Sequence, residues 1–168
     1  MSWGKLVCAG AIACTAGMLT ACSPTESGVV GLSVDDAGRT IVVLQDCDGD
    51  IDQLKLWDQG PRPETESDDV LLAEWYNPKS PKGIVQFPLV EGAGKWKSEQ
   101  RVPDLDPAKS YVLRGRSKDA SSNAAHLEFT SALLKTLKPG QILKLKVMPK
   151  VNTTEVVTLE QFTPKNCD

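Results

Sequence analysis

The sequence is poor in aromatic residues, in histidine and in basic charge. Aromatic residues make up 5% of the 168 residues, and His126 is the only histidine. The formal net charge of -3 lacks the basic excess that nucleic-acid-binding proteins usually carry, so no nucleic-acid partner is expected. A zinc site or a histidine-based triad would have to be built around a single imidazole, which argues against both.

Two common active-site motifs are also missing. The chain has no Gly-x-Ser-x-Gly nucleophile elbow and no Gly-x-x-x-x-Gly-Lys phosphate loop. What is present is ordinary for one globular domain, with 40% hydrophobic and 24% charged residues. We therefore expect a single domain that is not an enzyme and uses no cofactor.

The first residues have the composition of an export signal. Met1–Lys5 carries one positive charge, and Leu6–Met18 is a run of small and apolar residues. This run is shorter than the roughly 20 residues of a membrane-spanning helix, and it is typical of a secretory signal peptide. The following Leu19–Cys22 resembles the lipobox of bacterial lipoproteins. That resemblance implies cleavage before Cys22 and acyl chains such as palmitate on its diacylglyceryl-modified sulfur.

These features give three expected regions. Residues 1–21 are the lipoprotein signal peptide, residues 22–28 form a lipidated tether, and residues 29–168 form a single β-sandwich domain. The expected location is the extracytoplasmic face of a bacterial cell membrane, held there by the N-terminal lipid. The alternative is an ordinary secretory signal with an incidental cysteine at position 22.

The cysteine count agrees with export. Cys8 and Cys14 leave with the signal peptide, Cys22 takes the lipid, and Cys47 and Cys167 remain as a single pair. In an oxidising compartment such a pair is expected to form a disulfide. A closed loop of about 120 residues would contribute roughly 4–5 kcal/mol of stability in the chain-entropy model. A metal site and a reactive thiol are the competing interpretations.

The body of the chain predicts strands. Short apolar runs alternate with polar residues at period two and are separated by Gly, Pro, Asp and Asn, the pattern of half-buried strands in an all-β antiparallel sandwich. Only Ser131–Leu137 predicts a helical turn, which Pro139 and Gly140 would end. Strands are expected at Val29–Val34, Thr40–Cys47, Gln53–Trp57, Val70–Tyr76, Ile84–Val90, Lys95–Val102, Ser110–Arg116, Ala125–Thr130, Ile142–Met148 and Thr154–Phe162.

One segment narrows the predicted fold. Leu105–Leu113, with Pro107 and Tyr111, resembles the E–F corner of fibronectin type III domains. The resemblance implies that the Tyr111 hydroxyl bonds to nearby backbone, that Tyr111, Leu113 and Gly115 face the core, and that Arg114 and Arg116 point outward. About fifty residues follow this corner, where one last strand would suffice. The predicted fold is therefore an immunoglobulin-like (fibronectin type III-like) sandwich with an extra C-terminal hairpin at roughly 141–162.

The whole chain also resembles uncharacterised small lipoproteins of high-GC Gram-positive (actinobacterial) bacteria. The resemblance rests on the lipobox, on Gly31–Asp35, on a cysteine after the second strand, and on Phe129, Leu137–Gln141 and a closing Phe162 with Cys167. It implies an envelope location and an immunoglobulin-like sandwich. It implies nothing about chemistry.

The strongest chemical candidate is an acidic segment. Asp46, Asp48, Asp50 and Asp52 place four carboxylates on alternate residues, and calcium takes about six to eight oxygen ligands. The segment departs from a calcium-binding EF-hand loop, because Ile51 stands where the sharp-turn glycine belongs and a tryptophan stands where a bidentate glutamate is needed. A plain Asp-Gly turn with acidic neighbours is the alternative interpretation.

The tryptophans are the other candidates for binding. Trp75 shares strand parity with Leu71 and Ala73, so it is expected in the core. Trp57 and Trp96 are expected to be partly exposed, where they could contact a partner. Packing in the core or in a hairpin is the alternative for both.

The sequence thus favours a non-enzymatic binding or structural module of the cell envelope. Its partner would be an envelope protein or a cell-wall polymer, contacted through Gln59–Asp69, Asn77–Lys82 and Lys118–Asn123. A calcium-binding module built on the acidic segment is the second hypothesis. A small hydrolase using His126 is the third, although this histidine is expected to point to solvent with no partner set up around it.

Overall fold

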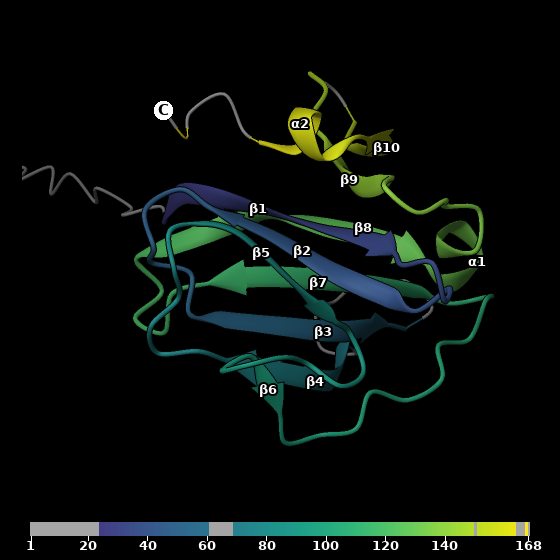
Figure 1. Ribbon diagram of the computed structural model, residues 1–168, viewed down its shortest axis with the longest axis horizontal. Helices are drawn as coiled ribbons and strands as arrows, with labels where there is room; N and C mark the ends of the chain where they lie inside the picture. The colour runs from purple at the N-terminus through teal and green to yellow at the C-terminus, as the bar shows by residue number, and fades with distance from the viewer. Residues whose placement is uncertain (1–23, 61–68, 150, 164–166, 168) are drawn as a thin grey trace, which may run out of the picture.

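The computed structural model describes residues 24–60, 69–149, 151–163 and 167, and over these residues the predicted all-β class is confirmed (Figure 1). Among them, no helix is both long and apolar enough to cross a membrane. The described strands are β1 (Thr25–Val34), β2 (Thr40–Asp46), β3 (Gln53–Gln59), β4 (Asp69–Tyr76), β5 (Gly83–Pro88), β6 (Lys97–Ser98), β7 (Ser110–Arg116), β8 (Ser122–Thr130), β9 (Ile142–Lys146) and β10 (Thr153–Val157), and the helices are α1 (Ser131–Leu134) and α2 (Leu159–Phe162).

Strand β1 holds the sheet together, because it is bonded along both of its edges. One edge pairs antiparallel with β2 from Gly28 to Val34. The other edge pairs parallel with β8 over Thr25–Val29 and then antiparallel with β9 over Gly31–Ser33. From β8 the sheet continues through β7, β3 and β4 to β6, while β9 leads to β10 at the opposite edge.

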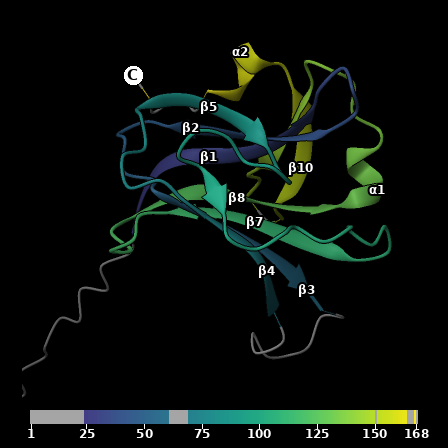
Figure 2. The ribbon, with the colours of Figure 1, turned by 60° about the horizontal axis from the view of Figure 1, so that its bottom comes forward.

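The sheet curls so that two groups of strands face each other (Figure 2). Strand β5 pairs with β2, and these two lie over β7, β3 and β4. The main core lies between the two groups and joins Leu44 and Phe87 from one to Leu56 and Leu113 from the other. All four side chains are at most 2% exposed. Burial of this apolar surface is the main favourable term in folding.

A second, smaller cluster covers the other side of β1 and β2. It consists of Val29 and Val43 from these strands, Ile142 at the start of β9, and Phe162 at the end of α2. Gly31 lies beneath it, and a Cβ atom at this position would come within 2.6 Å of the Phe162 ring. The predicted C-terminal hairpin is present as β9 and β10, and with α2 it shields the outer side of β1.

The structure departs from the predicted elements in four places. Strand β1 begins at Thr25 rather than Val29, so residues 25–28, expected in the tether, are strand residues. The pairing of β1 with β8 is parallel, in a fold predicted to be antiparallel. The strand expected at Thr154–Phe162 ends at Val157, because the Gln161 side chain accepts a hydrogen bond from the Thr158 backbone and the chain turns into α2. The strand expected at Lys95–Val102 is reduced to the two residues of β6. The helical turn expected at Ser131–Leu137 is present as α1, with the Thr130 hydroxyl accepting from the Leu133 amide.

Candidate functional site

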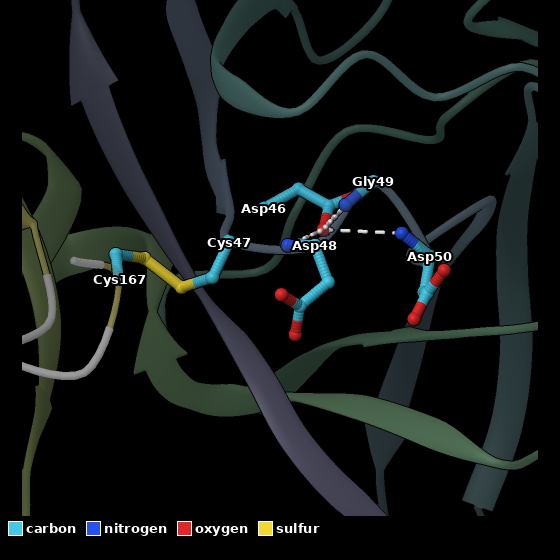
Figure 3. The surroundings of a disulfide bond; sticks show 6 residues. All are labelled: Asp46, Cys47, Asp48, Gly49, Asp50 and Cys167. Atoms are coloured by element: carbon cyan, nitrogen blue, oxygen red, sulfur yellow. Dashed lines mark hydrogen bonds between the residues drawn. A yellow bond between two sulfur atoms is a disulfide. The ribbon is translucent and has the colours of Figure 1, made fainter.

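The acidic segment after β2 is organised around the Asp46 carboxylate. Asp46 is fully buried, and its carboxylate accepts hydrogen bonds from the backbone amides of Asp48, Gly49, Asp50 and Ile51 at 2.8–3.3 Å. Figure 3 shows the first three of these bonds. Gly49 has a φ of +83°, a left-handed conformation that glycine adopts without steric cost. Asp46 therefore closes the loop on itself, as the interpretation of a plain Asp-Gly turn requires.

The four predicted calcium ligands do not converge. The Asp46 oxygens are occupied by backbone amides, and the Asp48 and Asp50 carboxylates extend separately from it (Figure 3). Among the described residues, no three His, Cys, Asp or Glu side chains are grouped so that they could hold a metal ion. The calcium site predicted at Asp46, Asp48, Asp50 and Asp52 is thus not assembled in this structure.

Cys47 and Cys167 lie at disulfide distance, as the cysteine count predicted. Their Cα atoms are 4.8 Å apart, and the pair spans 120 residues of sequence (Figure 3). Cys47 is buried at the end of β2, where its amide donates to the Ser27 carbonyl at 2.8 Å. The cross-link therefore ties the end of β2 to Cys167, and the hydrogen bond to Ser27 connects the same point to the start of β1.

Three loops meet beside this cross-link at one end of the fold. They surround a shallow pocket of about 590 Å³. It is lined by Gly49, Asp50 and Asp52 after β2, Pro78 and Ser80 after β4, and Ser117, Lys118, Asp119 and Ser121 after β7. Two of the predicted contact segments, Asn77–Lys82 and Lys118–Asn123, lie here. In the third, Gln59–Asp69, residues 61–68 lie outside the described residues, and its flanks pair with each other at the far end of β3.

Two carboxyl groups in this pocket, those of Asp52 and Asp119, have pKa values that are shifted in opposite directions. Burial raises the pKa of Asp52 above its usual 3.8. Hydrogen bonds from the Ser117 hydroxyl and from the Ser121 amide and hydroxyl lower the pKa of Asp119 to about 2. Asp119 is therefore charged throughout the physiological pH range.

The corner before β7 is built as its sequence predicted. The Tyr111 hydroxyl accepts a hydrogen bond from the Asp106 amide at 2.7 Å, and burial raises the pKa of this phenol. The Lys109 ammonium lies 2.6 Å from the Asp58 carboxylate, which raises the pKa of Lys109. On β7 itself, Leu113 is fully buried, whereas Arg114 and Arg116 are exposed.

The exposure of Trp57, Trp75 and Trp96 differs from the prediction at one position. Trp75 is fully buried, as expected, and Trp57 is half-buried on the outward side of β3. Trp96 was expected to be partly exposed, but it is 3% exposed and stacks on Phe87 with ring centroids 5.6 Å apart. The exposure prediction for Trp96 was wrong, and a buried ring in this position cannot contact a partner.

The outward side of β3, β4 and β7 carries a polar network that the sequence did not reveal as a unit. Arg116 Nε donates to the Gln53 side chain at 2.8 Å, and the Gln53 amide in turn bonds to Glu74. Lys55 Nζ lies 3.7 Å from the same Glu74 carboxylate. The signal available in the sequence was the alternation of Arg114, Arg116 and Lys118, but the partner residues come from other strands.

His126 lies on the outward side of β8. Its Nε2 is 3.7 Å from Glu128, and both side chains are partly exposed. Among the described residues, this is the one ionic contact of the imidazole. In the part of the chain that the structure describes, no serine, threonine or cysteine side chain is hydrogen-bonded to the His126 imidazole. The geometry therefore gives the hydrolase hypothesis no support.

Comparison with known proteins does not identify a relative of this chain. The resemblances noted in the sequence, to actinobacterial lipoproteins and to fibronectin type III domains, gain no independent support from such comparison. No protein family, curated protein or solved structure matches the chain.

Proposed function

We propose that the chain is an extracytoplasmic lipoprotein, anchored through a lipid on Cys22 to the outer face of a bacterial cell membrane. The observation that carries the proposal is the pairing of Cys47 with Cys167 at disulfide distance. Structural disulfides form and persist in oxidising compartments outside the cytoplasm. The Leu19–Cys22 segment supplies the means of attachment, and two acyl chains hold a protein stably at a bilayer.

The domain is proposed to be an immunoglobulin-like sandwich of the fibronectin type III kind. The strand pairing favours it, since β1, β2 and β5 form one group and β8, β7, β3 and β4 form the other. The hydrogen bond between Tyr111 and the Asp106 amide also favours it, because this bond pins the crossover in such domains. The β9–β10 hairpin is an addition to that plan.

The module is proposed to act by binding rather than by catalysis. Its contacts would be made with an envelope protein or a cell-wall polymer through exposed loops and through Trp57. The support is that exposed loops cluster at one end of the fold, as in other binding domains built on sandwiches.

The anchoring proposal is tested by mass spectrometry of the chain extracted from membranes of a bacterial host, with and without reductant. We expect a mass that starts at diacylated Cys22 and is two hydrogens lighter than the reduced form. A Cys22→Ala variant is the matched control, and it should accumulate without lipid. An uncleaved chain with free thiols at Cys47 and Cys167 would contradict the proposal.

A further inference from the structure

The outward side of β3 and β7 is basic, although the chain as a whole is acidic. Lys55 on β3 and Arg114, Arg116 and Lys118 on and after β7 form what we call the basic face. Arg114, Arg116 and Lys118 are exposed, and they alternate with inward-pointing residues, so all three side chains lie on one side. The chain itself has a formal net charge of -3.

The carboxylates on this side of the sheet lie on or beside the strands that flank the basic face. Glu99 lines a groove with Tyr76 and Lys118, Asp69 lies opposite Gln59 at the far end of β4, and Glu26 lies beside Asn123 of β8. Glu74 pairs with Lys55, and Glu128 lies beside His126. None of the described carboxylates comes within 4.0 Å of Arg114, Arg116 or Lys118. These three cations are therefore free to meet an anionic surface without breaking an ion pair within the described part of the protein.

The proposed lipid anchor lies close to this face. The Thr25 amide at the start of β1 donates to the Ser121 carbonyl at 2.9 Å, in the loop that also carries Lys118. Cys22 is three residues before Thr25, so even a fully extended chain spans only about 11 Å between them. Lipid on Cys22 would thus hold the end of β7 near the headgroups.

The end of the fold beside the anchor carries exposed Lys79 and Lys82 together with several carboxylates, so it attracts an anionic membrane less than the basic face does. Asp48 and Asp50 are exposed there, and Asp119 is charged at neutral pH because its pKa is about 2. An anionic membrane repels these groups and attracts the basic face. Trp57 adds to the preference for the basic face, since its half-buried ring lies on the same outward side and tryptophan favours the membrane interface.

From this charge distribution we infer that the domain lies with its basic face on the anionic phospholipid headgroups of the membrane that anchors it. This inference rests on the proposed function, because it needs the lipid on Cys22. It leaves the opposite layer of β2 and β5, and the turn between β1 and β2, facing the envelope. The surface open to a partner is therefore that layer, and Trp57, named above as a partner contact, would face the lipid instead.

The test uses the lipidated full chain in two kinds of vesicle, one of phosphatidylcholine and one of phosphatidylcholine with phosphatidylglycerol in equal parts. Arginine and lysine side chains are labelled with water-soluble reagents, and the rates are read by mass spectrometry. With about a fivefold contribution expected from each Lys or Arg at an anionic surface, labelling of Arg114, Arg116 and Lys118 should slow roughly tenfold or more with phosphatidylglycerol. Lys135 and Lys138, near α1, should label at one rate in both.

Charge-reversal variants distinguish this orientation from nonspecific adsorption of the protein to the vesicles. Arg114→Glu with Arg116→Glu should abolish the protection of Lys118, whereas Lys135→Glu with Lys138→Glu, which changes the net charge equally, should leave it. If the glutamate pair fails to fold, Arg114→Gln with Arg116→Gln is used and should reduce the protection. Raising the salt to about 0.5 M should also remove it, because the screening length then falls to roughly 4 Å.

The outcomes distinguish the two proposals. Equal labelling of Arg114, Arg116 and Lys118 in both vesicles, with the Cys22 peptide carrying its lipid, would overturn the docked orientation and leave the anchoring proposal standing. A Cys22 peptide without lipid would overturn both. Protection of Lys135 and Lys138 in place of the basic face would also overturn the inference, since the domain would then dock by its opposite end.

Discussion

At the scale of single residues, the Asp46 carboxylate is the group on which the loop after β2 depends. It is fully buried and accepts four backbone amides. We expect Asp46→Ala to lower the free energy of unfolding by about 3 kcal/mol, because buried N–H donors left without an acceptor are costly. Urea unfolding followed by circular dichroism measures this. Asp48→Ala, at an exposed position, is the control and should change stability by less than about 0.5 kcal/mol.

The Tyr111 hydroxyl makes a smaller and separable contribution. Tyr111→Phe keeps the buried ring but removes the acceptor of the Asp106 amide, so we expect a loss of about 1 kcal/mol in thermal or urea unfolding. Tyr76→Phe, on the partly exposed ring beneath Lys118, is the matched control and should be close to neutral. A loss that is equal in both variants would contradict a specific role for the corner.

Asp119 makes stability depend on pH at the acidic end of the range. Its pKa is about 2 in the folded chain and near 3.8 in the unfolded chain, so the unfolded state binds the proton first as the pH falls. The contribution is therefore complete above about pH 4 and is lost as the pH falls through about 2. Ser121→Ala should raise the pKa of Asp119 towards 3.8 in an NMR titration, and Ser98→Ala should not. An unchanged pKa in Ser121→Ala would contradict the assignment.

At the scale of elements, strand positions followed from the sequence because period-two alternation records one buried face. β3 shows this directly, since Leu54 and Leu56 are fully buried while Gln53, Lys55 and Trp57 are partly exposed. Trp96 departs from its predicted exposure. Its lysine neighbours predict an exposed ring, but adjacent residues near a strand point in opposite directions, so exposed Lys95 and Lys97 are consistent with a buried ring.

The C-terminal turn α2 could not be anticipated from alternation alone. Thr154–Phe162 reads as a strand throughout, yet the bond between the Thr158 amide and the Gln161 side chain starts a helix. The position of Phe162 depends on a glycine far away in sequence, because Gly31 leaves the space that the ring fills. A contact between residues so distant leaves no local pattern, and the same holds for the Gln53, Glu74 and Arg116 network.

The contribution of α2 to the fold can be measured through Phe162. We expect Phe162→Ala to cost about 3–5 kcal/mol, because the ring is fully buried against Val29, Val43 and Ile142. Leu159→Ala in the same turn, at a position that is 41% exposed, should cost less than about 1 kcal/mol. Equal small effects in both variants would mean that the C-terminal turn does not shield β1 in solution.

At the scale of the whole molecule, the cross-link between Cys47 and Cys167 closes nearly the entire domain into one loop. Its removal should lower the free energy of unfolding by about 4–5 kcal/mol, since the unfolded chain regains the freedom that a loop of 120 residues had lost. The measurement is urea unfolding with and without reductant. In the Cys47→Ala, Cys167→Ala variant, reductant should have no further effect, which separates the disulfide from general effects of the reagent.

The place of β1 in the sheet has a mechanical consequence. β1 is bonded to β2 on one edge and to β8 and β9 on the other. A pull on the proposed lipid anchor would load this strand along its own length. The hydrogen bonds on both edges lie across that direction, so they would be sheared together instead of opening one after another. A pull on the edge strand β10 would instead break its hydrogen bonds to β9 one after another. The fold should therefore resist a larger force when it is pulled from its N-terminal end.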